Sequence, residues 1–137
     1  SNVVRDEPKR ADQTFDLYDL LVVLGERALN ATWFGNGVNC DGENSEELYA
    51  FTDQDRPIQG RKLLDIASGI HQTFEGDFTA FDSNTDAYWI LIRAWHGSGF
   101  YIEIDDPENE QRLKAHFESA EDVQEVHPPY NGFFIPR

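Results

Sequence analysis

Apolar residues recur three and four positions apart in three segments of the chain, the spacing that places them on one face of a helix. The first helix is expected to begin after Asp12 or Thr14, either of which can cap it. Residues 60–70 give the second helix. The third begins at Asp106 as its cap, with Pro107 at the first helical position. The inward positions of the first helix are Leu17, Leu20, Leu21, Leu24 and Ala28.

Alternation of apolar and polar residues predicts strands elsewhere in the chain. Residues 31–35 form one strand, which residues 38–40 can continue beyond a glycine-containing turn signal. Residues 48–52 alternate like a second strand. Residues 72–81 form a third, in which Gly76 indicates a bulge or a close approach of another chain segment.

The segment 88–105 predicts a β-hairpin whose register follows from charge. A three-residue turn at residues 97–99 places Arg93 opposite Glu103, whereas a two-residue turn places Arg93 opposite an isoleucine. Opposite charges across a strand pair are favourable, so we predict the three-residue turn. In that register the residues facing the core are Ile90, Ile92, Ala94, Phe100, Ile102 and Ile104.

Helices interspersed among successive strands predict an α+β fold, a mainly antiparallel sheet of about five to six strands packed on one face by two to three helices. The 137 residues match the size of one domain. We place that domain at residues 13–137, after a polar arm at residues 1–12 that we expect to be flexible. Residues 123–127 suggest an edge strand. The aromatic side chains of the tail, residues 128–137, are expected to pack onto the body.

The charge balance narrows the function. Twenty-six acidic residues face eleven basic ones, a net charge of −15, which repels nucleic acids and anionic membranes and attracts basic surfaces. The alternative is that the acidity serves solubility alone. No apolar run approaches the roughly 18 residues of a membrane span. The single cysteine, Cys40, fits a reducing compartment, so the expected location is the cytoplasm.

The second face of the hairpin is the candidate partner-binding surface, because tryptophan, tyrosine and arginine are enriched at interface hot spots. Its predicted members are Trp89, Leu91, Arg93, Trp95, Tyr101 and Glu103. An acidic loop adds Glu43, Glu46 and Glu47, whose charge would speed the approach of a basic partner. Two alternatives stand beside this hypothesis: the acids are simply solvated, or another layer, such as the tail with Phe133 and Phe134, covers the face.

Catalytic and metal-binding motifs give weaker signals. The four histidines lack zinc-ligand spacing, and residues 82–86 begin like a calcium loop that lacks the required glycine and glutamate further on. Glu75 and Asp77 resemble a carboxylate pair, as do many pairs in so acidic a chain. Cys40 is expected to be simply buried, and His96 to face the core side at the sheet rim. We therefore predict no catalytic residue, no metal site and no cofactor.

These observations favour a binding protein over an enzyme. The leading hypothesis is a small acidic protein that recognises and neutralises a basic protein, in the manner of an immunity protein or antitoxin that inhibits a bacterial toxin. Three alternatives remain open: a nucleic-acid-mimic inhibitor, a small carboxylate-based hydrolase or lyase, and an accessory domain that is acidic for solubility. The sequence leaves the oligomeric state undetermined.

Overall fold

The computed structural model describes residues 15–124 and 128–137. These residues form one seven-stranded antiparallel sheet with the strand order β2-β1-β3-β4-β5-β7-β6. The strands are β1 (Thr32–Asp41), β2 (Ile58–Gln59), β3 (Gln72–Phe81), β4 (Ile90–Ala94), β5 (Gly99–Ile104), β6 (Glu121–Asp122) and β7 (Asn131–Pro136). The helices are α1 (Leu17–Leu24), α2 (Glu26–Asn30), α3 (Ser45–Thr52), α4 (Gly60–Ala67) and α5 (Pro107–His116).

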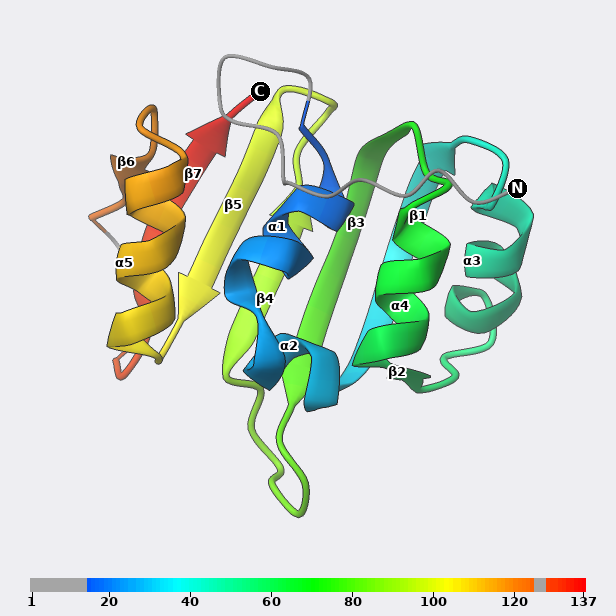
Figure 1. Cartoon of the computed structure of the whole chain (residues 1–137), viewed down its shortest axis with the longest axis horizontal. Helices are drawn as coiled ribbons and strands as arrows, with labels where there is room; N and C mark the ends of the chain where they lie inside the picture. The colour runs from blue at the N-terminus through cyan, green and yellow to red at the C-terminus, as the bar shows by residue number, and fades with distance from the viewer. Residues whose placement is uncertain (1–14, 125–127) are drawn as a thin grey trace.

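The predicted α+β class is confirmed, with more elements than expected. Figure 1 shows α1, α2, α4 and α5 lying across one face of the sheet, with α3 beside β1 at the sheet edge. The described residues contain seven strands instead of five to six, because the two-residue β2 and the six-residue β7 were not predicted, whereas the strand predicted at residues 48–52 is helical. They contain five helices instead of two to three, because α2 and α3 were not predicted. The predicted arm, residues 1–12, lies outside the described residues.

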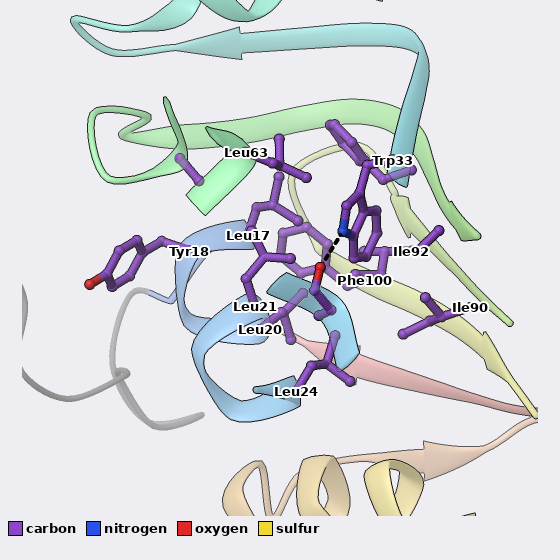
Figure 2. Packing of buried hydrophobic residues seen from close by; sticks show 14 of the residues in the cluster. Leu17, Tyr18, Leu20, Leu21, Leu24, Trp33, Leu63, Ile90, Ile92 and Phe100 are labelled. Carbon is purple, nitrogen blue, oxygen red and sulfur yellow. Dashed lines mark hydrogen bonds between the residues drawn. The ribbon is translucent and has the colours of Figure 1, made fainter. Parts of the chain in front are cut away.

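The core lies between the helices and the helix-facing side of the sheet. The predicted stripe of the first helix is fully buried, although Gly25, with a φ of 73°, ends α1 so that Ala28 belongs to α2. The six predicted core residues of the hairpin are also buried. Trp33 sits at the centre of this packing, where its Nε1 donates a 2.8 Å hydrogen bond to the carbonyl of Ala28 (Figure 2).

The helix termini follow the sequence signals in part. Asp106 caps α5 as predicted, because its Oδ1 accepts from the backbone N–H of Asn109 at 3.1 Å. The predicted caps of the first helix, Asp12 and Thr14, lie outside the described residues. Asp16 holds the N-cap position of α1, and its N–H donates to the carboxylate of Asp19.

The strand predicted at residues 48–52 is wrong, because these residues belong to α3. Leu48 and Thr52, four residues apart, are the buried positions of that helix. Five residues are too few to separate a period of two from one of 3.6. The helix also places Tyr49 against β1. The hydroxyl of Tyr49 accepts a hydrogen bond from the N–H of Cys40 and donates one to the carbonyl of Cys40, both at 2.9 Å. These bonds occupy backbone groups on the outer edge of β1.

The hairpin has the predicted faces but a different register. Arg93 pairs with Tyr101 instead of Glu103, and the turn is residues 96–98, because the Trp95 N–H already bonds the carbonyl of Gly99 at 3.0 Å. The prediction failed because the acidic partner of Arg93 is Asp77, which lies opposite it on the neighbouring strand β3. Gly99 is needed inside the strand, since a side chain there would collide with the carbonyl of Ile135 on β7.

Three further details concern β1 and β3, and the predicted close approach at Gly76 is confirmed. β1 runs unbroken from Thr32 to Asp41, with a bulge where a turn signal was expected. In β3, Gly76 is a close approach, since a Cβ there would lie 3.1 Å from the Cα of Val38. A second irregularity, between Asn39 and Cys40 of β1, puts Thr73 on the buried side, where strict alternation with Phe78 and Ala80 would put Phe74.

The chain end completes the sheet. The tail forms β7 between β5 and β6, so its aromatic residues do pack onto the body, with Phe133 in the core. The predicted edge strand at residues 123–127 is replaced by β6 at Glu121–Asp122, and residues 125–127 lie outside the described residues.

Candidate functional site

The side of the sheet that points away from the helices, called the open face below, carries two rows of side chains across five strands. In the described ranges no helix packs on it (Figure 1). Cross-strand pairing defines the first row as Asn36, Asp77, Arg93, Tyr101 and Phe134. The second row is Phe34, Thr79, Leu91, Glu103 and Gly132. The tail therefore extends this face, with Phe134 on it, and does not cover it.

The open face is more aromatic than an ordinary solvated sheet face, which favours polar residues. Trp95, just beyond β4, is 50% exposed, the highest exposure of any large apolar side chain in the described residues. Phe34 and Phe81 contact each other edge to face at the β1 end, with ring centroids 5.9 Å apart. Tyr88 and Tyr130 stack at the other end, with centroids 4.9 Å apart.

An ion pair holds the middle of the first row. The guanidinium of Arg93 donates two hydrogen bonds to the carboxylate of Asp77, at 2.7 and 3.0 Å, across the β3–β4 pair. This bidentate geometry is the strong form of an arginine–carboxylate pair. Asp77 was noted in the sequence only as a carboxylate next to Glu75. The pair links β3 to β4 across the first row.

A carboxylate shared by two phenols lies in the second row. Glu103 accepts from the hydroxyl of Tyr88 at 2.8 Å and from that of Tyr101 at 2.7 Å. Burial raises the pKa of Tyr101 to about 12, and the hydrogen bond to Glu103 contributes in the same direction. The pKa of Tyr88 is raised by the same two causes in the same order. Both phenols therefore stay protonated and fixed at neutral pH.

Alkaline solution tests this phenol pair. Because the pKa of Tyr101 rises from 10.0 to about 12 on folding, the native state holds a proton that the unfolded state releases first. The contribution to stability is complete below pH 10 and is lost as the pH rises through about 12. We expect the free energy of unfolding, measured by urea titration, to fall across this window, and to fall less in Tyr101→Phe. An equal fall in both proteins would contradict the assignment.

Trp89 is not on this face, which corrects the prediction. It lies before the start of β4, is 2% exposed, and packs under the guanidinium of Arg27, 4.2 Å from the ring centroid. Burial does not alternate at the start of β4, since residues 89–92 are all buried, including Leu91 of the second row at 7% exposure. Tyr88 contributes to the open face instead. Sequence spacing alone would have found it only if the strand boundary had been known.

His96 also differs from the prediction. It lies in the turn with a φ of 49°, its side chain is 66% exposed, and it does not face the core. Its Nδ1 lies 2.6 Å from Oε1 of Glu75. The change follows from the register, which places the turn at residues 96–98 and so puts His96 in the loop.

The predicted acidic part of the site lies elsewhere. Glu46 and Glu47 are in the first turn of α3, and Glu47 pairs with Lys62 of α4 at 2.7 Å. Because Thr52 of α3 contacts the helix-facing side of β1 at Gly35, this helix belongs to the helical side of the molecule. Glu43 lies in the loop between β1 and α3. The structure thus unites Arg93, Trp95, Tyr101 and Glu103 but separates all three acids from them.

Sequence reasoning missed Asn36, Asp77 and Phe134. The alternation of Asp77 and Thr79 on a half-buried strand carried a usable signal, since both had to face away from the core. Phe134 carried none, because nothing in the tail composition indicates that it inserts as a strand beside β5. These residues widen the candidate surface from one hairpin to five strands.

The other candidate sites are occupied by structural contacts. Both carboxylate oxygens of Asp82, from the suspected calcium loop, bond the guanidinium of Arg27. Within residues 15–124 and 128–137 no three potential ligands gather in the manner of a metal site. Cys40 is buried as predicted, and burial raises the pKa of its thiol, which makes it a poor nucleophile at neutral pH.

Comparison with known proteins adds no relative: no family model, curated protein or solved structure matches this chain. None of the helices in the described ranges combines the length and apolar character that a membrane span requires. The functional argument therefore rests on the open face itself.

Proposed function

We propose that this protein is a small acidic binding protein that docks a basic protein on its open face and neutralises it, in the manner of an immunity protein or antitoxin acting in the cytoplasm. The observation that carries the proposal is a sheet face on which no helix of the described residues packs, with a half-exposed tryptophan, tyrosines and a fixed arginine. Such residues dominate binding energy at interfaces. The net charge of −15 supports a basic partner.

The sheet edges support docking on the face over addition of a strand. Strand addition needs free backbone groups along an edge. At the β1 edge, β2 pairs with Thr32 and Trp33, and Tyr49 bonds Cys40 further along. At the other edge, β6 pairs with β7, and Pro136 has no N–H to offer. A partner thus finds the open face more accessible than either edge.

Affinity capture from a lysate of the source organism tests the proposal, with washes at low and high salt read by mass spectrometry. We expect one basic protein to be retained at low salt and released more readily at high salt, because exposed charges are screened. Enrichment of no basic protein at either salt would contradict the proposal.

Trp95→Ala is expected to weaken the captured complex by about 2 kcal/mol or more, the loss typical of an interface hot spot. Isothermal titration calorimetry with the purified partner measures this change. Phe51→Ala is the matched control, since Phe51 is a partly buried aromatic residue of α3 on the helical side. Equal weakening by both variants would place the interface elsewhere.

A further inference from the structure

An open depression lies in the open face where β1 and β3 depart from regular pairing. Between the pairs Asn36–Asp77 and Asn39–Glu75, β1 carries one more residue than β3. This bulge includes Gly37, whose φ of 62° suits glycine, and a Cβ there would meet nothing within 4 Å. The depression has a volume of about 330 Å³. That is the lower end of the range for ligand sites, a size that suits one long side chain.

The charged groups that line the depression leave one acceptor available. Both oxygens of Asp77 are taken by Arg93. Oε1 of Glu75 lies against His96, whereas its Oε2 has no partner among the described residues. Because Arg93 is already paired with a carboxylate, the available charge in the depression is the negative one of Glu75.

The remaining wall is aromatic and polar. Trp95 lines the depression with half of its surface exposed, and the exposed Asn36 lies at the opposite wall on β1. A carboxylate beside an indole ring is a pairing that suits a guanidinium, which bonds the carboxylate through its N–H groups and stacks on the ring. An anion would meet the Glu75 carboxylate and the field of a chain with a net charge of −15.

We propose that this depression receives an arginine side chain of the basic partner, with the guanidinium between Glu75 and Trp95. The inference rests on the proposed function, because it names the group by which the partner would be anchored. Arginine fits better than lysine since a planar guanidinium can stack on the indole while it bonds the carboxylate.

A nuclear magnetic resonance titration tests the site without the partner. The full ¹⁵N-labelled chain is titrated with N-acetyl-arginine amide, and with N-acetyl-citrulline amide as a neutral probe of the same shape. We expect saturable shifts of the Trp95 indole N–H and of the amides of Gly37 and Glu75 with arginine, at least about fivefold weaker with citrulline. No saturable shift, or equal responses to both probes, would overturn the inference.

Two variants sharpen the result. Glu75→Gln is expected to weaken arginine binding at least about fivefold, and Trp95→Leu to weaken it while keeping an apolar side chain at the wall. Glu46→Gln on α3 is the charge-matched control and should leave the titration unchanged. The amide spectrum of each variant reports whether it is folded. A basic partner that binds wild type and Glu75→Gln equally would overturn the arginine site and leave the proposed function standing.

Discussion

Asp16→Ala is expected to lower the free energy of unfolding by about 3–5 kcal/mol, because it leaves the largely buried guanidinium of Arg137 without a counter-charge. Asp16 is 3% exposed. It accepts hydrogen bonds from the N–H and hydroxyl of Thr73, at 2.9 and 2.7 Å, and from the guanidinium of Arg137 at 2.6 Å. Arg137 is itself held over the rings of Phe15 and Phe100. Without the carboxylate, this guanidinium, whose side chain is 10% exposed, loses its counter-charge.

Urea unfolding followed by circular dichroism measures this effect. Asp16→Asn is expected to lose less, since the amide oxygen still accepts from Thr73. Combining Asp16→Ala with Arg137→Met should cost less than the sum of the single changes, because the double variant leaves no unpaired charge. Glu46→Ala, an exposed acid, should change stability by under about 0.5 kcal/mol. Additive losses in the double variant would show that Asp16 and Arg137 are not coupled.

The Asp16–Arg137 pair also shows what sequence patterns do not contain. The two residues are 121 positions apart and lie in contact because β7 inserts beside β5. Periodicity describes which face of an element is apolar, and it found the stripe of α1 and the faces of the hairpin, while the capping signals found the start of α5. It carries no information on which distant elements become neighbours, so the strand order and the buried ion pair were beyond it.

The errors at the candidate site have the same origin. Charge pairing was the correct principle for Arg93, but the partner came from β3, which the local hairpin argument did not include. Trp89 was assigned to the open face because the strand was begun two residues too early, at residue 88 instead of Ile90. Trp95, Tyr101 and Glu103 were assigned correctly, since a register error of two residues preserves the face of each side chain.

Trp33→Ala is expected to destabilise the fold by about 3–5 kcal/mol, the range for removing a fully buried aromatic side chain. Trp33→Phe separates packing from hydrogen bonding. The Ala28 carbonyl accepts from the indole of Trp33 at 2.8 Å, and its other contact, with the N–H of Ala31, is long at 3.4 Å. Losing the indole donor should therefore cost about 1–3 kcal/mol in addition to the loss of volume.

Trp89→Phe is the matched control, because the Nε1 of Trp89 is buried and has no hydrogen-bond partner among the described residues. Phenylalanine there removes an unsatisfied donor and keeps a ring beneath Arg27, so it should cost at least about 1 kcal/mol less than Trp33→Phe. Urea unfolding of both variants gives the comparison. Equal losses would mean that the Trp33–Ala28 hydrogen bond adds nothing to packing. A larger loss for Trp33→Phe than for Trp89→Phe would mean that this bond helps to hold α2 against β1, a strand that contributes to the open face.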